Sequence, residues 1–222
     1  GGGLKGGFDS QIRFSAATGD RASAGNGAAL FHGANAYLSG NFGTARVGKI
    51  IENNNCAFDP WACTGGAGLI AGAAGTIGAS GQGLVGALTI QNAVSYATPT
   101  IAGFSAGYQT TVSTRTYERQ VLNLNYANGP LAIQYLQTKN SLNVAADGGT
   151  IVDANGKGTS IAASYDLGVA KLAVFKAKTD KATAGTLPAS NPDRDITGVT
   201  ASVPMGAVTL LAGYAKDKKA AS

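Results

Sequence analysis

The stretch from Val121 to Tyr135 reads VLNLNYANGPLAIQY and combines two alternating segments with a turn between them. In the first segment apolar residues occupy every second position and asparagines fill the gaps: Leu122, Asn123, Leu124, Asn125 and Tyr126. Successive side chains of a β-strand point to opposite faces of a sheet, so this pattern predicts a strand with one apolar and one polar face. Asn128-Gly129-Pro130 is a turn signal, and the alternation resumes at Leu131 and Ile133. The stretch therefore predicts a β-hairpin.

The same two-residue period recurs along the rest of the chain. Apolar members of alternating segments include Phe8, Ile12, Phe14, Ala170, Leu172, Val174, Val208, Leu210, Ala212 and Tyr214. About eleven strands are predicted in this way, and the 33 glycines argue against a helical protein because glycine weakens helix interiors. The fold class predicted is all-β and antiparallel.

Short and long connections between these strands alternate without exception. Tight turns are predicted at Gly40–Gly43, Thr98–Ala102, Asn128–Pro130, Asp166–Gly168 and Pro204–Gly206. Long connections are predicted at Ala17–Ala28, Asn53–Leu88, Thr111–Glu118, Ser141–Gly158 and Thr179–Asp193. A strand meander of this kind has short turns at one end and long loops at the other, which is typical of transmembrane β-barrels.

The composition also favours a transmembrane β-barrel over a soluble domain. Charged residues make up 13% of the 222 residues, whereas about 25% is usual for soluble domains. The uncharged run Leu69–Ile90 is interrupted by six glycines, so it does not resemble a transmembrane helix. The net charge is +5, but the lysines and arginines are scattered and no nucleic-acid-binding motif is present, so no nucleic-acid partner is expected.

Low charge, many glycines and the asymmetry of the loops together favour lipid outside the sheet and water inside it. Every backbone polar group in lipid must be paired internally, so the strands of such a sheet have to close into a barrel. The side chains expected to face lipid include Leu122, Leu124, Ile133, Leu172 and Leu210. Barrels of single chains usually have an even number of strands. Residues 1–222 are therefore expected to form one β-barrel domain that is incomplete at both ends.

The sequence gives little support for an enzyme or for a metal-binding protein. The single histidine, His32, has no evident catalytic partners in sequence, and residues 81–86, which match GxGxxG, lack the flanking strand and helix of a dinucleotide site. Cys56 and Cys63 are not in CxxC spacing and no histidine is near, which argues against a metal site. They form either a local disulfide or two thiols. No enzyme activity, cofactor or metal is expected.

Several segments resemble the general diffusion porins of Gram-negative outer membranes. The segments that carry the resemblance are Gly2–Lys5, Leu38–Gly43, Arg46–Lys49, Asn92–Pro99, Ala102–Phe104 and Tyr165–Leu172. The resemblance implies a sixteen-stranded barrel that forms homotrimers, of which this chain would supply the third through thirteenth strands. It also implies an outer-membrane location, with lipid and lipopolysaccharide as partners, and a water-filled channel for passive diffusion of small hydrophilic solutes and ions.

The resemblance also gives the long connection Asn53–Leu88 a role. It corresponds to a loop that folds into the barrel and narrows the pore, so residues 53–88 are expected to be a constriction loop. Two positions of the wall where the family usually has arginine are His32 and Thr89, and a third is Lys49. Candidate loop carboxylates are Glu52 and Asp59, and Asp9 and Arg13 are further charged candidates for the pore lining. The sequence thus predicts a weaker anion preference than in relatives with a complete arginine wall.

A soluble or surface-exposed β-rich structural protein, such as an adhesin, is the alternative from a different class. It would share the abundance of Gly, Ala, Thr and Asn. The rhythm of short and long connections favours the porin.

Overall fold

The computed structural model describes residues 3–12, 31, 33–51, 89–112, 117–142, 156–179 and 194–218. Eleven strands lie in these ranges: β1 (Lys5–Gln11), β2 (Gly33–Gly40), β3 (Gly43–Ile51), β4 (Thr89–Ala97), β5 (Phe104–Thr111), β6 (Tyr117–Asn128), β7 (Leu131–Leu142), β8 (Gly156–Asp166), β9 (Lys171–Thr179), β10 (Arg194–Met205) and β11 (Val208–Asp217). A helix with the length and hydropathy of a membrane span is absent from the same ranges.

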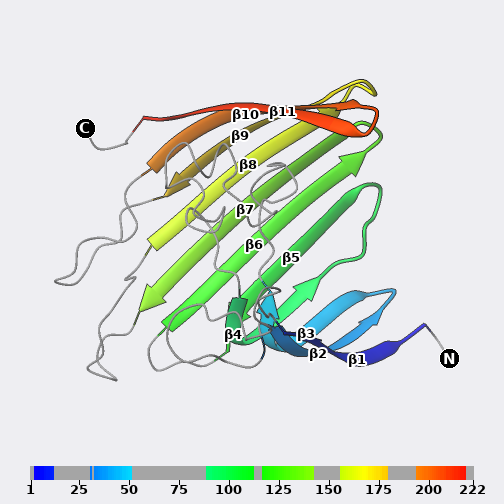
Figure 1. Cartoon of the computed structure of the whole chain (residues 1–222). Coiled ribbons are helices and arrows are strands. Elements are labelled where there is room, and N and C mark those ends of the chain that lie inside the picture. Colours follow the sequence, from blue (N-terminus) through cyan, green and yellow to red (C-terminus); the bar gives the residue numbers. More distant parts are fainter. Residues whose placement is uncertain are drawn as a thin grey trace, which may run out of the picture.

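The strands form one curved sheet in which each strand pairs antiparallel with its neighbours in the chain. Figure 1 shows β1 and β11 at opposite edges of this sheet, and β1 does not pair with β11 among the described residues. The predicted all-β, antiparallel fold with about eleven strands is confirmed. Within the described ranges the sheet is open rather than closed into a barrel.

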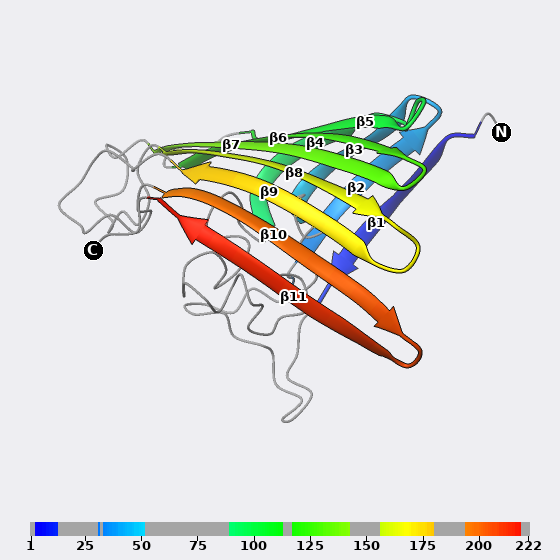
Figure 2. The ribbon, with the colours of Figure 1, turned by 90° about the horizontal axis from the view of Figure 1, so that it is seen from above.

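The short turns all lie at one end of the sheet. Few residues separate the strands at 41–42, 98–103, 129–130, 167–170 and 206–207, as the sequence predicted. Figure 2 shows the hairpin turns of β6–β7, β8–β9 and β10–β11 gathered on the right, away from the ends where the long connections begin. The sheet therefore has a short-turn end and a long-connection end.

The convex face of the sheet is apolar. In one row across the strands, Tyr126 pairs with Ile133 and Val174 pairs with Val199, which in turn pairs with Tyr214. Many large side chains of this face are exposed, including Val47, Val94, Phe104, Leu124, Ile161, Leu172, Val174, Val199, Leu210 and Tyr214. The register puts the five residues expected to face lipid on this face, so the prediction that they share one face is confirmed.

The concave face carries the polar residues that alternate with them. Its buried polar side chains are Asn35, Gln109, Arg119, Asn123, Gln134, Thr138, Ser160, Ser164 and Thr200. Gln134 also bonds a half-buried neighbour on this face: its Nε2 atom donates a hydrogen bond of 2.8 Å to Oδ1 of Asn125. This is the arrangement of a barrel with lipid outside and polar groups inside.

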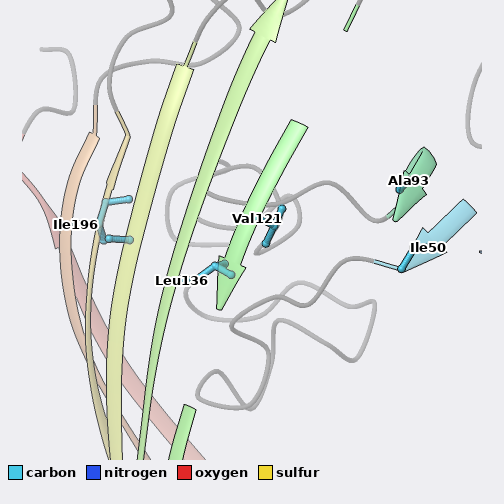
Figure 3. Packing of buried hydrophobic residues seen from close by; sticks show 6 residues of the cluster. Ile50, Ala93, Val121, Leu136 and Ile196 are labelled. Carbon is cyan, nitrogen blue, oxygen red and sulfur yellow. The ribbon is translucent and has the colours of Figure 1, made fainter. Parts of the chain in front are cut away.

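A cluster of apolar side chains on the concave face was not predicted. Its members are at most 4% exposed: Ile50, Ala93, Val121, Leu136, Ala177 and Ile196. Figure 3 shows Ile196 projecting from β10 on one side of the curve and Ile50 from β3 on the other. The wall on the concave side is therefore polar with an apolar band, rather than uniformly polar.

Candidate functional site

A charged cluster lies on the concave face of the first strands, and Arg46 of β3 is its centre. Thr44 and Arg46 alternate with Ala45 and Val47, and the two small or apolar residues are exposed on the convex face. Arg46 pairs in register with Tyr37 of β2, next to the row in which Asn35 is buried. The strand period therefore turns the guanidinium toward the concave side.

Three neighbouring groups hold this guanidinium. Its Nη1 atom donates to the carboxylate of Asp9 on β1, forming an ion pair, and to Oδ1 of Asn35 at 2.8 Å. Its Cζ atom lies 5.2 Å from the centroid of the Tyr37 ring, within the range of a cation–π contact. The side chains of Arg46 and Asp9 remain 34% and 51% exposed. The charges are thus fixed in place but accessible to water.

Gly7 makes room for this arrangement. A Cβ atom built at Gly7 would lie 2.8 Å from the Tyr37 hydroxyl oxygen and 2.9 Å from two of its ring carbons. Because Gly7 has no side chain, the ring of Tyr37 can lie across β1 and still contact Arg46 on its other side. A glycine that looks unremarkable in the sequence therefore shapes the site.

A bulge between β3 and β4 ends the regular wall beyond Arg46. Gly48 pairs with Ala93 but Ile50 pairs with Ile90, so β4 holds one extra residue there. Asn92 adopts a positive φ of 47°, and its carbonyl accepts a hydrogen bond of 2.7 Å from the backbone nitrogen of Val112. Bulges of this kind change the direction of side chains and increase the local twist of the strand.

The cluster borders a recess of about 540 Å³ on the concave side. The residues that line it are Asp9, Ser10, Gln11, Gly33, Asn35, Thr44, Arg46, Ile50, Ser95, Tyr96, Ala97 and Gln109. Hydroxyl, amide and charged groups of β1 to β5 thus surround one space. Such a lining can replace part of the hydration shell of a small polar solute or ion.

The structure locates some of the predicted site residues. Asp9 lies on the concave face, in the cluster. Lys49 does not lie beside Arg46: it pairs with Ala34, in the series that faces the convex side, and its Nζ atom donates to the carbonyl oxygen of Phe31 at 2.8 Å. Lys49 is therefore no longer proposed as a residue of the pore wall.

The backbone of Thr89 belongs to β4 and pairs with Ile51, but its side chain is outside the described set. The remaining candidates lie outside the described residues: Arg13, His32, Glu52, Cys56, Asp59, Cys63 and the expected loop 53–88.

Sequence reasoning missed two cations of the concave face, Arg46 and Arg119. Arg119 lies on β6 and is only 4% exposed, and its backbone nitrogen donates to Oγ1 of Thr111 at 3.1 Å. The signal for Arg46 was present in the alternation of Thr44, Ala45, Arg46 and Val47. Within the described ranges, no group of three or more His, Cys, Asp and Glu side chains is placed to hold a metal.

Solved structures share this architecture. An anion-selective porin from Comamonas acidovorans is 25% identical, with a TM-score of 0.67 over 98% of this chain and 66% of that chain. A loop-deletion mutant of OmpT from Vibrio cholerae is 16% identical, with a TM-score of 0.58 over 83% of this chain and 61% of that chain. A mutant of the porin of Rh. blastica is 15% identical, with a TM-score of 0.63 over 98% and 71%.

This chain spans slightly less than two thirds of the length of the first of these porins. No curated protein matches it by sequence. A family model described as Gram-negative porin, however, matches residues 1–222, the whole of the sequence. Together with an antiparallel sheet that is apolar on its convex face and polar on its concave face, this match establishes that the chain belongs to the Gram-negative porin family.

Proposed function

We propose that the complete protein forms a water-filled channel through which small hydrophilic solutes and ions diffuse passively. As a member of the Gram-negative porin family, it is a protein of the outer membrane. The observation that carries the proposal is the contrast between the two faces, with Val174 and Val199 exposed on the convex side and Arg46 held in a polar recess on the concave side. A soluble protein with this sheet would leave a broad apolar face in water, which is costly, so the adhesin alternative is not favoured.

Solutes would cross by passive diffusion, and the polar groups on the concave wall determine how they pass. A solute that enters the lumen exchanges part of its water shell for hydroxyl and amide groups such as those of Ser95, Asn35 and Gln109. Because these groups are fixed on strands, they need little rearrangement when the solute passes. Weak, repeated contacts of this kind allow a solute to leave as readily as it enters.

Arg46 gives the wall a preference between ions. Its charge stands at the recess and is partly balanced by Asp9, so the local field is positive but modest. Fields of single charges fade over about 10 Å at 0.1 M salt, so only charges at the narrow part of the lumen matter. We infer a moderate preference for anions. The similar porin from Comamonas acidovorans is described as anion-selective, which agrees in direction.

The segment 53–88 is proposed as the constriction loop, with Glu52 and Asp59 as its carboxylates and His32 and Thr89 facing them in place of arginines. The protein is proposed to assemble as a homotrimer, and the OmpT of Vibrio cholerae, which has the same fold, was solved in a trimer form.

A liposome-swelling assay tests the channel. Vesicles that contain the folded full-length protein are diluted into isotonic solutions of neutral sugars of increasing size. A general diffusion channel predicts swelling rates that fall smoothly with solute size and do not saturate with concentration. Rates equal to those of protein-free vesicles for the smallest sugar would overturn the proposal, and saturation for one sugar would replace it with a specific channel.

A further inference from the structure

The guanidinium group of Arg46 is held at one corner. Its Nη1 atom carries two hydrogens and donates to two acceptors, the carboxylate of Asp9 and Oδ1 of Asn35. A guanidinium group has five N–H donors in a fixed plane, so the remaining donors belong to Nη2 and Nε. Among the residues that the structure describes, none accepts a hydrogen bond from these two nitrogens. The Nε–Nη2 edge thus offers parallel donors that the described wall does not use.

The neighbours of Arg46 keep this edge in one orientation. The ring of Tyr37 lies against one face of the guanidinium plane, with Cζ 5.2 Å from the ring centroid. Asp9 on β1 and Asn35 on β2 hold the Nη1 corner, and Figure 1 shows β1, β2 and β3 side by side at one edge of the sheet. A side chain that is already ordered loses little freedom when it binds a ligand. The donors of Arg46 are therefore preorganised.

Further donors lie beside Arg46 around the recess. The Arg46 side chain is 34% exposed and lines the recess, together with Ser95 and Gln109. Ser95 of β4 pairs directly with Arg46, and Gln109 of β5 pairs directly with Ser95. Directly opposite residues on one face of a sheet have Cβ atoms about 5 Å apart. The Ser95 hydroxyl is therefore close enough to donate to a small group that is bound at Arg46.

The arrangement of the donors and charges indicates the class of ligand. Two parallel N–H donors match the two oxygens of a carboxylate, whereas chloride presents one centre and cannot use both in the same way. Asp9 partly balances the charge of Arg46, so little net charge is left to compensate a dianion such as sulfate. A dianion also loses more hydration than a monoanion when it leaves bulk water. The site is thus better suited to a single carboxylate.

We propose that the recess beside Arg46 binds the carboxylate group of small organic acids, through the Nε–Nη2 edge of Arg46 with Ser95 as a further donor. This inference rests on the proposed channel function and specifies which anions the channel favours. It goes beyond a general preference for anions, because it assigns the selectivity to the shape of the arginine as well as to its charge. Asp9, Asn35 and Tyr37 act as positioning residues.

The first test measures binding of acetate to the folded full-length protein in a neutral detergent, by saturation-transfer NMR of the acetate methyl protons. Arg46→Lys keeps a positive charge but lacks the paired donors, so it should weaken acetate binding by about fivefold, the effect of losing one hydrogen bond. Lys49→Gln, on the same strand and the other face, is the matched control and should bind acetate within about twofold of the unmodified protein. Equal affinity of the Arg46→Lys variant and the unmodified protein would overturn the proposal.

Zero-current potentials in potassium chloride separate the role of charge from the role of shape. Because Arg46→Lys keeps the charge and Arg46→Gln does not, the chloride-to-potassium permeability ratio should be higher in the lysine variant. Acetate binding should be weak in both. If lysine restores acetate binding along with the chloride preference, the recess responds to charge alone and the carboxylate site is wrong.

Asp9 gives a test in the opposite direction, which a damaged wall would not mimic. Asp9→Asn keeps an oxygen acceptor for Nη1 and removes a negative charge beside the site, so acetate should bind about twofold more tightly after screening by salt. Weaker binding would count against the proposal. Chloride and sulfate should displace acetate only at several times its own concentration; displacement by either ion at equal concentration would overturn the assignment to carboxylates.

The two proposals can fail separately. Conductance in potassium chloride without detectable binding of acetate would overturn the carboxylate site and leave the channel intact. Binding of acetate by a protein that conducts no ions would overturn the channel, while the recess would remain a carboxylate site.

Discussion

Arg46 and Lys49 lie three positions apart on β3 and face opposite sides of the sheet. Arg46 pairs with Tyr37 and reaches Asp9 and Asn35 on the concave face. Lys49 pairs with Ala34, and its ammonium group contacts the carbonyl oxygen of Phe31. Positions an odd number apart on a strand point in opposite directions, so two cations that look equivalent in the sequence have different surroundings.

Replacing each of these cations by glutamine should therefore have different effects on selectivity. Arg46→Gln should lower the anion-to-cation permeability ratio by about threefold. A unit charge about 7 Å from an ion is worth about 0.6 kcal/mol in water, salt roughly halves this, and the effect has opposite signs for the anion and the cation. Lys49→Gln removes the same charge from the same strand and should leave the ratio nearly unchanged. Zero-current potentials in a potassium chloride gradient measure both. Equal effects of the two substitutions would show that β3 is assigned to the wrong faces.

Gly48 should be far less tolerant of a side chain than Gly129. Gly48 has a φ of +132°, and a Cβ atom there would lie 2.4 Å from the backbone oxygen of Ala34. Gly129 has a φ of +56° in the β6–β7 turn with open space around it. Gly129→Ala should cost about 1 kcal/mol from the left-handed conformation alone. Gly48→Ala should lower the free energy of unfolding by about 1–3 kcal/mol through backbone strain. The clash of the new Cβ atom with the backbone of the neighbouring strand should lower it further.

Unfolding by urea in lipid vesicles, followed by the heat-modifiable shift in gel mobility, compares the two glycine variants of the full-length protein. The larger loss of unfolding free energy is expected for Gly48→Ala. Should Gly129→Ala prove the more damaging, the close approach of β3 to β2 at Gly48 would be in error.

An arginine on the convex face should be costly, and the same residue on the concave face should not. Leu124 of β6 is 43% exposed on the convex face, and its neighbour Asn125 is half-buried on the other. Leu124→Arg should lower the unfolding free energy by about 2–4 kcal/mol if the position is near the middle of the bilayer. Asn125→Arg is the matched control. Asn123 on the same face is less suitable, because it is only 5% exposed and an arginine there would lack space. Similar folding yields of both variants in lipid vesicles would contradict the lipid-facing assignment.

Much of the fold could be predicted from the sequence because a two-residue period is a local signal. The alternation around Leu124, the Asn128–Pro130 turn and the rhythm of short and long connections all correspond to the observed strands. The apolar band on the concave face could not be predicted in this way. Leu136 and Ile196 fall on the polar series of their strands, and only the register across β7 to β10 brings them to a common side.

The site was less predictable than the fold. The motifs shared with the porin family selected Lys49 for the pore wall, because a motif match does not show which face of a strand a residue occupies. The alternation of Ala45 and Val47 with Arg46 does show it. The pairing of Arg46 with Asp9 joins residues 37 positions apart and depends on the registers of two strand pairs. The room that Gly7 leaves for Tyr37 depends on side-chain packing, of which the sequence carries no sign.

Conductance of the intact protein in a planar lipid bilayer tests the central claim most directly. A water-filled channel through a barrel with Arg46 on its wall predicts discrete openings whose conductance rises in proportion to that of the bulk salt solution, with a moderate preference for chloride over potassium. Folded protein that inserts into the bilayer and yet gives no openings, or gives openings selective for cations, would contradict it.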